Sequence, residues 1–182
     1  MKQTALVVAL LGILGFALAA PGAETQTALV AHADLKNADG KDVGRANFRQ
    51  NKEGVIITVR VENLAPGLHA VHLHAAGKCE GPKFASAGGH FNPANKKHGF
   101  KGSGGYHAGD LPNLLVTKLG TGRFETVTNE VTLGEGANSI FNADGSAVVL
   151  HAADDDYKTD PAGNSGDRIA CGAIVKGPPP RQ

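Results

Sequence analysis

The 182-residue chain lacks an excess of charge of either sign, and this bears on the partners it can have. It holds 18 Lys and Arg against 17 Asp and Glu, and one of the basic residues, Lys2, lies in an N-terminal apolar segment. Without Lys2 the basic and acidic counts are equal, 17 against 17. A nucleic-acid-binding surface needs a basic patch or stripe. We therefore expect no nucleic-acid partner.

Tryptophan is absent, aromatic residues make up only 5% of the chain, and there is one methionine. Glycine is abundant, with 25 residues, but it follows no collagen-like period, so we assign it to loops and tight turns. The hydrophobic share of 41% and the charged share of 19% are ordinary for a folded domain and argue against a disordered chain. Against this background eight histidines stand out, and they point to metal chemistry.

The first 23 residues have the layout of a secretory signal peptide. Lys2 is their one charged residue, and an apolar run of about 16 residues follows from Ala5 to Ala20, short of the roughly 20 that span a bilayer. Small residues allow cleavage after Ala19, Ala20 or Ala23. We expect the leader, residues 1–23, to be removed and the mature chain to have no stable membrane insertion.

Cysteine is scarce, with Cys79 and Cys171 the only two residues of this kind. An even count without a leftover thiol fits one disulfide in an oxidising compartment. No cysteine lies near the leader, which excludes lipid attachment there. We expect an exported protein, placed most readily in the periplasm, with secretion or a cell-envelope location left open.

The rest of the chain alternates apolar and polar residues with the period of a half-buried strand. Residues 29–36 show this pattern, and so do residues 55–62. Six further strand candidates lie at residues 45–50, 68–74, 114–118, 123–132, 147–150 and 169–176. No segment has a convincing helical period. Eight short strands are typical of a sandwich or barrel, so the expected class is all-β.

Two long segments interrupt the strands. Residues 75–106 are rich in glycine and histidine, and residues 152–167 are polar, with an acidic run at residues 154–156. Long loops without secondary structure are uncommon in compact domains unless they carry function. We expect one domain over residues 24–176 and a flexible proline-rich tail over residues 177–182.

Histidine spacing indicates where a metal could bind. His72 and His74 are two positions apart in a strand candidate, so their side chains share a face and can approach one ion. Further candidates follow in the long loop and after a later strand: His90, His98, His107, Asp110 and His151. Four imidazole nitrogens suit Cu(II), whereas three nitrogens and one carboxylate oxygen suit tetrahedral zinc.

Four segments of the chain resemble the copper/zinc superoxide dismutase family and follow one another in the family's order. They are Gly67–His74, Ser86–Gly99, His107–Asn113 and Gly163–Gly172, within a match from about Thr27 to Lys176. The resemblance implies an eight-stranded Greek-key flattened β-barrel, an immunoglobulin-like sandwich, with two long functional loops. It also implies that the protein is an enzyme, a superoxide dismutase that converts superoxide to oxygen and hydrogen peroxide.

The resemblance further implies a site with one copper and one zinc ion per subunit. Copper alone would be bound by His72, His74 and His151. Both metals would be bridged by His90. The zinc site would be completed by His98, His107 and Asp110. Asp155, or Asp154 if the acidic run is read in another register, would accept from the free ring nitrogens of His72 and His98.

The same resemblance also implies a disulfide and two catalytic residues. Cys79 and Cys171 would form the intrachain disulfide. Arg168 would bind and orient the superoxide anion, and His90 would be catalytic with it, through a proton that its ring takes up and gives to the peroxide. Asp160 and Asp167 lie close to Arg168 in sequence, and we expect them to compete for its guanidinium.

Two histidines are not expected to be ligands. By strand parity, His69 shares a face with neither His72 nor His74, and it resembles a structural residue that braces the copper loop. His32 has no motif around it and is taken as an ordinary strand residue.

Two alternative functions stay open. An exported copper-binding or copper-delivery module on the same fold need not keep Arg168 or the full zinc set. A zinc hydrolase would need an open zinc position and a general base, and no spare Glu follows the histidine motifs. The sequence also leaves open whether the subunit forms a homodimer.

Overall fold

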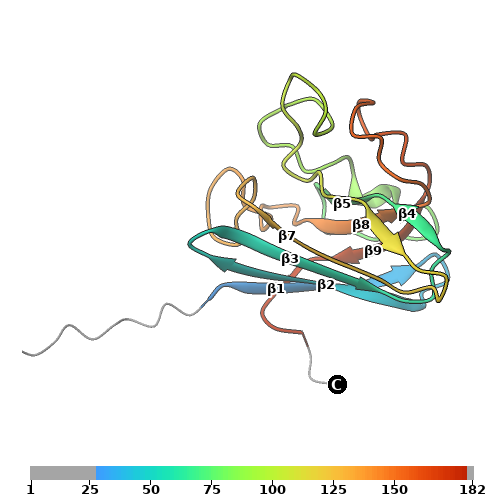
Figure 1. Ribbon diagram of the computed structural model, residues 1–182. Coiled ribbons are helices and arrows are strands. Elements are labelled where there is room, and N and C mark those ends of the chain that lie inside the picture. The colour runs from blue at the N-terminus through green and yellow to red at the C-terminus, as the bar shows by residue number, and fades with distance from the viewer. Residues whose placement is uncertain (1–27, 180–182) are drawn as a thin grey trace, which may run out of the picture.

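The computed structural model describes residues 28–179, and its strands form one ten-stranded sheet (Figure 1). The elements are β1 (Val30–Asn37), β2 (Asp42–Asn51), β3 (Gly54–Val61), β4 (Gly67–His69), β5 (Val71–His74), the 3₁₀ turn η1 (Ala85–Ala87), β6 (Leu114–Val116), β7 (Gly122–Thr128), β8 (Ala147–His151), β9 (Arg168–Ala173) and β10 (Val175–Lys176). The expected leader, residues 1–23, lies outside the described residues, as do residues 180–182 of the expected tail. Within residues 28–179, no helix has the length and hydrophobicity needed to cross a bilayer.

The sheet runs in the order β4-β6-β7-β3-β2-β1-β9-β8-β5, with β10 paired to β1. Its two end strands, β4 and β5, are consecutive in the chain and are separated only by Ala70. The sheet therefore curls back on itself into a nearly closed antiparallel barrel with Greek-key order. The expected all-β Greek-key barrel is confirmed.

The number of strands differs from the expected eight because two predicted strands are divided. The segment 68–74 breaks at Ala70, whose N–H donates to the Ala153 carbonyl and whose own carbonyl accepts from the His151 N–H. The segment 169–176 breaks at Ile174, whose N–H donates to the Ser146 carbonyl. At the first break the chain changes its pairing partner from β6 to β8, whereas β9 and β10 both pair with β1. A period-two pattern reports which face is buried, not which strand is the neighbour.

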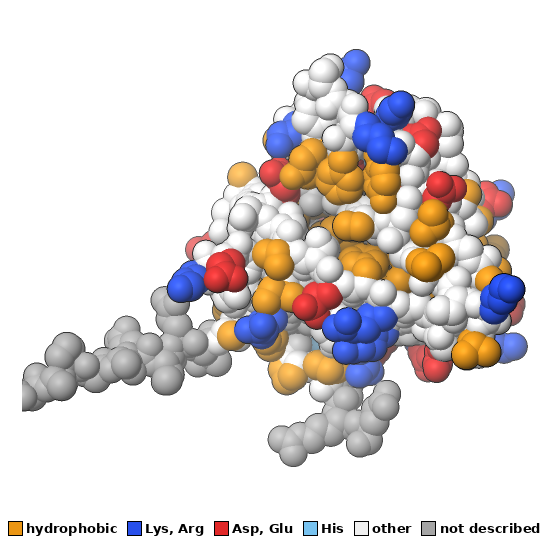
Figure 2. Space-filling model, in the orientation of Figure 1, with side chains coloured by type: hydrophobic (Ala, Val, Ile, Leu, Met, Phe, Trp, Pro, Cys, Tyr) orange, Lys and Arg blue, Asp and Glu red, His pale blue; other side chains and the backbone are white. Residues whose placement is uncertain are grey.

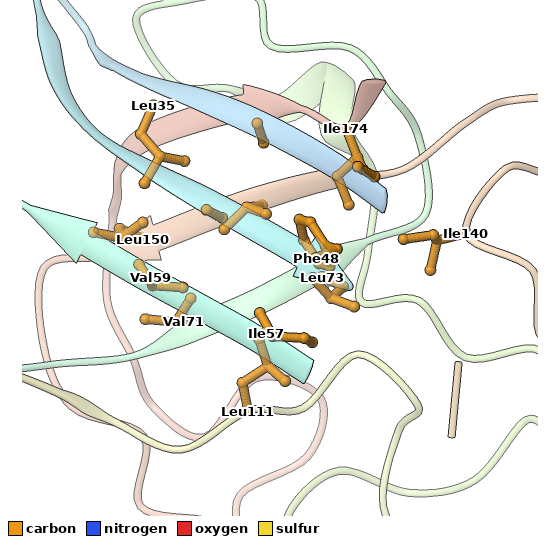
Figure 3. Packing of buried hydrophobic residues seen from close by; sticks show 14 of the residues in the cluster. Leu35, Phe48, Ile57, Val59, Val71, Leu73, Leu111, Ile140, Leu150 and Ile174 are labelled. Atoms are coloured by element: carbon orange, nitrogen blue, oxygen red, sulfur yellow. The ribbon is translucent and has the colours of Figure 1, made fainter. Parts of the chain in front are cut away.

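The core fills the interior of the barrel with side chains from alternate positions of the strands. In β3, Val55, Ile57 and Val59 are fully buried, whereas Arg60 points outward. Figure 3 shows Ile57 among apolar residues contributed by strands on both sides of the barrel and by the loops. Each such side chain contributes roughly 1.5–3 kcal/mol through burial. This packing gives the loops a rigid base.

The connection between β7 and β8 covers part of the core, which the sequence did not indicate. The expected strand 123–132 ends at Thr128, and the chain then runs irregularly to β8. Val131, Leu133 and Ile140 from this connection belong to the main core cluster. The Leu133 N–H donates to Gln50 Oε1 at 2.7 Å, which fixes the connection against β2.

The other two long connections carry the predicted histidines and lie on one side of the barrel. Residues 75–113 join β5 to β6, and residues 152–167 join β8 to β9; both project from the top of the barrel in Figure 1. They are bonded to each other, because the Lys101 N–H donates to the Tyr157 carbonyl at 3.0 Å and the Asn113 N–H donates to Tyr157 Oη at 2.8 Å. We call them the first loop and the second loop.

A disulfide fastens the first loop to the barrel. Cys79 and Cys171 are bonded although 92 positions separate them, so the predicted disulfide is confirmed. Cys171 lies on β9 and packs in a small apolar cluster with Phe84 and Ala87 from the first loop. The cross-link and this cluster together hold the part of the first loop that contains η1.

Candidate metal centre

Neighbouring strands bring the first three histidines together. His72 and His74 lie on β5, and His151 ends β8, which pairs with β5 in antiparallel register. All three are buried, with at most 3% of each residue exposed. Hardly any imidazole surface is visible on the face shown in Figure 2. Their burial excludes the interpretation of these residues as surface histidines.

The first loop lies directly on β5. The Leu73 N–H donates to the Gly109 carbonyl, the Phe91 N–H donates to the Leu73 carbonyl, and the Gly109 N–H donates to the Phe91 carbonyl, each at 2.8 Å. A Cβ on Gly109 would lie 2.3 Å from the Leu73 oxygen, so only glycine permits this approach. The arrangement places His90 and Asp110, the residues next to Phe91 and Gly109, beside the strand histidines.

The tautomers of the strand histidines follow from their hydrogen-bond partners. His74 Nδ1 donates to the Gly88 carbonyl at 2.9 Å, and His72 Nε2 donates to Asp155 Oδ2 at 3.0 Å. His151 Nδ1 lies 3.3 Å from the Gly166 carbonyl. Carbonyl and carboxylate oxygens only accept, so these nitrogens carry the protons. The other nitrogen of each ring keeps its lone pair.

Those remaining nitrogens converge on one point. His72 Nδ1, His74 Nε2, His90 Nε2 and His151 Nε2 are buried and have no hydrogen-bond partner within residues 28–179. They lie within 4.8 Å of one another and form what we call the four-histidine group. A buried polar atom without a partner costs about 1–3 kcal/mol, and four converging lone pairs repel one another unless a cation lies between them. Four imidazole nitrogens are a donor set that fits copper.

The charge state of the four-histidine group also suits a metal. Burial lowers the pKa of His72 to about 4 and the pKa of His151 to about 3, against an effect of Asp155 and of the Gly166 carbonyl in the other direction. Burial likewise lowers the pKa of His74 well below its ordinary value. The rings of His72, His74 and His151 are therefore neutral at pH 7, which is the form that binds metal ions.

A second group forms around Asp110. Asp110 Oδ1 lies 2.9 Å from His90 Nδ1, 3.1 Å from His98 Nδ1 and 3.4 Å from His107 Nδ1, and His90 Nδ1 lies 3.3 Å from His107 Nδ1. A tetrahedral zinc site with bonds of about 2.0–2.1 Å has ligand-to-ligand edges of roughly 3.3 Å. These four residues, which we call the mixed group, therefore have a spacing that fits zinc.

The backbone of the first loop orients the Asp110 carboxylate. Its Oδ2 accepts the N–H of Gly99 at 2.9 Å and the N–H of His107 at 3.0 Å, which directs Oδ1 toward the imidazoles. Burial raises the pKa of Asp110, but hydrogen bonds with His90 and His98 outweigh it and hold the pKa well below the ordinary range. The carboxyl group is therefore ionised, as a metal ligand must be.

His90 belongs to both groups. Its Nδ1 faces Asp110, and its Nε2 is one of the four unpartnered nitrogens. The side chain is only 4% exposed. One ring thus presents a nitrogen to each group, which is the geometry that a bridging imidazolate requires.

Asp155, and not Asp154, lies between the two groups. Its Oδ2 accepts from His72 Nε2 and its Oδ1 accepts from His98 Nε2 at 2.9 Å, whereas Asp154 is exposed. Burial lowers the pKa of His98, but hydrogen bonds with Asp110 and Asp155 outweigh it and raise that pKa to about 9. One carboxylate therefore fixes the outward nitrogen of a histidine in each group.

Arg168 is bound by carbonyl groups and not by acids. Its Nη1 donates to the Phe84 carbonyl at 2.7 Å, and its Nη2 donates to the Gly88 carbonyl at 2.6 Å. No acidic side chain of the described part of the chain forms an ion pair with it. The expected competition from Asp160 and Asp167 is therefore wrong, because the guanidinium turns toward the first loop.

The two remaining histidines do not join either group. His69 Nδ1 lies 2.8 Å from the His151 carbonyl and its Nε2 lies 2.9 Å from the Ala65 carbonyl, so it braces the backbone beside His151. His32 Nδ1 donates to the carbonyl of Gly177, the first residue of the expected tail. Both lie outside the metal groups found among the described residues.

The family of the chain is settled by sequence comparison. Residues 43–174 match the family model described as copper/zinc superoxide dismutase (SODC). The chain belongs to the copper/zinc superoxide dismutase family. It is 47% identical over 148 residues to superoxide dismutase [Cu-Zn] 1 of Aquifex aeolicus (strain VF5), which covers 80% of this chain and 88% of that protein.

Some relatives of this chain are named superoxide dismutase-like and not superoxide dismutase. The superoxide dismutase-like protein YojM of Bacillus subtilis (strain 168) is 43% identical over 149 residues, covering 79% of this chain and 75% of that protein. A crystal structure of a SOD-like protein from Bacillus subtilis superposes with a TM-score of 0.76 at 42% identity, covering 79% of this chain and 97% of that one.

One residue near the centre was not anticipated in its place. From the sequence, Asp160 was expected only to pair with the guanidinium of Arg168. In the structure its Oδ1 accepts the N–H of His98 at 2.9 Å. The two residues are 62 positions apart and lie in different loops. No local pattern could have revealed this contact, because it depends on how the second loop lies on the first.

Proposed function

We propose that this chain is a superoxide dismutase that converts two superoxide anions into oxygen and hydrogen peroxide, with one copper and one zinc ion per subunit. The observation that carries the proposal is the set of four unpartnered nitrogens that shares His90 with the mixed group. Family membership supports it, since the curated Aquifex relative bears the name of this enzyme.

The residues divide between the two metals as their free donor atoms indicate. Copper would be held by His72, His74, His90 and His151, and zinc by His90, His98, His107 and Asp110. Bound copper supplies a one-electron couple that cycles between Cu(II) and Cu(I), which zinc lacks, and bound zinc supplies a fixed positive charge on the other side of His90.

His90 and Arg168 would act on the substrate. The ring of His90 is held at Nδ1 by Asp110 of the mixed group. Its Nε2, which belongs to the four-histidine group, can therefore take up a proton without the ring turning. Arg168 uses two of its five N–H groups on carbonyl oxygens and keeps the others for an anion. Its planar, permanently charged fork would bind and orient superoxide.

The alternative function, an exported copper-binding or copper-delivery module, is less well supported. Delivery of copper requires neither a second set of ligands that includes a carboxylate nor a guanidinium held beside the copper ligands. Both are present here, and Asp155 joins the two groups through buried hydrogen bonds.

The test is metal content and dismutase activity, measured on the same sample of the mature chain. We expect one copper and one zinc per chain, and dismutase activity that persists when a chelator removes unbound copper. His151→Ala should lose copper and activity and retain zinc, whereas Asp110→Ala should mainly lose zinc. A fully loaded parent chain without dismutase activity would leave the binding module as the function.

We further propose that the protein is exported and acts in the periplasm after cleavage of residues 1–23. The leader composition and the disulfide between Cys79 and Cys171 support this, because structural disulfides persist in oxidising compartments. N-terminal sequencing of protein from fractionated cells should find a start after Ala19, Ala20 or Ala23. An intact Met1 on cytoplasmic protein would contradict export.

We also propose that the subunit forms a homodimer through the outer face of β4 and β6. Leu68 and Leu115 lie directly opposite each other in the register of these strands and are 47% and 61% exposed. A two-fold interface is self-complementary, so one apolar pair can pack on its copy. Light scattering should find a dimer for the parent and a monomer for Leu115→Glu, with Leu119→Glu, in the nearby turn, as the control.

A further inference from the structure

Two carboxylates of the second loop contact the mixed group, and Asp155 is one of them. The other is Asp160, whose side chain is 52% exposed. Its Oδ1 accepts the His98 N–H at 2.9 Å and lies 3.9 Å from His107 Nε2. Asp160 therefore contacts two members of the mixed group from outside, by one hydrogen bond and one longer charge–imidazole contact.

The orientation of the two rings gives these contacts a direction. His98 and His107 both turn Nδ1 toward Asp110 Oδ1, at 3.1 and 3.4 Å, so both turn Nε2 outward. His98 Nε2 meets Asp155, and His107 Nε2 faces Asp160. Two carboxylates of one loop, five positions apart, thus receive the outward nitrogens of two histidines in the mixed group.

The loop between these carboxylates is held in shape by Asp156. Its Oδ1 accepts the N–H of Lys158 and the N–H of Thr159, each at 2.8 Å. Its Oδ2 accepts the Thr159 hydroxyl at 2.6 Å and Asn164 Nδ2 at 3.0 Å. These four bonds fix the turn that presents Asp160, so its position follows from the loop and not from chance exposure.

We propose that Asp160 is a positioning residue for the zinc ligands. Its carboxylate holds the backbone of His98 and attracts the outward nitrogen of His107, which keeps both Nδ1 atoms directed toward the ion. Loss of a group that orients a metal-binding histidine typically lowers metal affinity by roughly 10- to 100-fold. The proposal rests on the proposed function, because it takes the mixed group as a zinc site.

Two substitutions at Asp160 separate its contacts. Asp160→Ala removes both, whereas Asp160→Asn keeps an oxygen that can accept the His98 N–H and removes the charge that faces His107. Asp154→Ala is the matched control, because Asp154 is an exposed acid of the same loop for which no side-chain hydrogen bond is found among the described residues. The copper-loaded full chain is dialysed to equilibrium against a series of buffered Zn²⁺ solutions, and both metals are counted by mass spectrometry.

We expect Asp160→Ala to weaken zinc binding by roughly 10- to 100-fold and Asp160→Asn to weaken it by less. Copper content should stay at the parent value in both, and Asp154→Ala should behave as the parent. Co²⁺ loaded in place of zinc gives a second readout, because its visible absorption bands respond to ligand geometry. Asp160→Ala should shift these bands, which a merely structural role would not do, even if it lowered the melting temperature of the metal-free chain.

The outcomes distinguish this proposal from the proposed function. Parental zinc affinity and an unchanged Co²⁺ spectrum in Asp160→Ala would overturn the role of Asp160 while leaving the zinc site in place. A parent chain that takes up no zinc at all would overturn both.

Discussion

Arg168 and His74 donate to the same acceptor, the carbonyl oxygen of Gly88. Arg168 Nη2 lies 2.6 Å from this oxygen and His74 Nδ1 lies 2.9 Å from it. One backbone group therefore sets the position of the guanidinium relative to a ring of the four-histidine group. The disulfide at Cys171, three residues after Arg168 on β9, ties the same part of the first loop to the barrel.

Replacement of Arg168 should separate anion binding from metal binding. Arg168→Ala should retain near-normal copper and zinc, because His74 keeps its own bond to Gly88, and its dismutase rate should fall severalfold or more. Arg168→Lys should recover part of the rate, since it restores the charge without the planar fork. Stopped-flow assays at several ionic strengths measure this, with the exposed Arg123→Ala as control. Full activity in metal-loaded Arg168→Ala would end the case for an anion-binding role.

Replacement of Asp155 should weaken the binding of both metals. Asp155→Asn keeps the size of the side chain but removes the charge that accepts from His72 and His98. Affinity for each metal should drop by roughly 10- to 100-fold. Titration of the metal-free chain with each ion measures the loss, and Asp154→Asn should titrate like the parent. A loss confined to one metal would show that Asp155 does not couple the two groups.

A methyl group at Gly109 should displace the first loop from β5. Its Cβ would lie 2.3 Å from the Leu73 oxygen and 3.0 Å from the Phe91 nitrogen, where neither backbone can give way cheaply. Gly109→Ala should lower stability by about 1–3 kcal/mol, as overpacking does, and reduce zinc content. Gly104→Ala is the matched control, because its Cβ would meet only the Lys97 side chain, at 3.7 Å or more. Urea unfolding and metal analysis decide between them.

The metal-free chain should be most stable near pH 6.5. The pKa of His98 is raised to about 9 in the fold, so its contribution is complete below the ordinary value of about 6.5 and is lost as pH rises toward 9. The pKa values of His72 and His151 are lowered to about 4 and about 3, so the unfolded chain takes up protons first and stability falls as pH drops from 6.5 toward 3.

Chemical unfolding of the metal-free chain between pH 4 and 9 tests this profile. His98→Gln should flatten the alkaline limb and leave the acid limb in place. A free energy of unfolding that rises steadily from pH 6.5 to 9 would contradict the assigned state of His98.

The amino-acid sequence by itself determined the fold class and the members of the site. Period-two alternation fixes the inward face of each strand because hydrophobic burial acts at alternate positions, as in Val55, Ile57 and Val59. The spacing of His72 and His74 placed two imidazoles on one strand face, and the resemblance of four segments to the family implied the other residues that the fold brings together. Two cysteines left only one intrachain pairing.

The tertiary structure alone decided how those residues are oriented. Ala70 divides a predicted strand because its hydrogen-bond partners are Ala153, in the second loop, and His151, at the end of β8. The free nitrogen of His72 follows from Asp155, which is 83 positions away. Ring tautomers and the partners of Arg168 depend on acceptors from other segments, and the contact of Asp160 depends on a donor, the His98 N–H, 62 positions away. Local propensity and spacing carry no information about such acceptors, because only the packing of the two loops on the barrel brings them within hydrogen-bond distance.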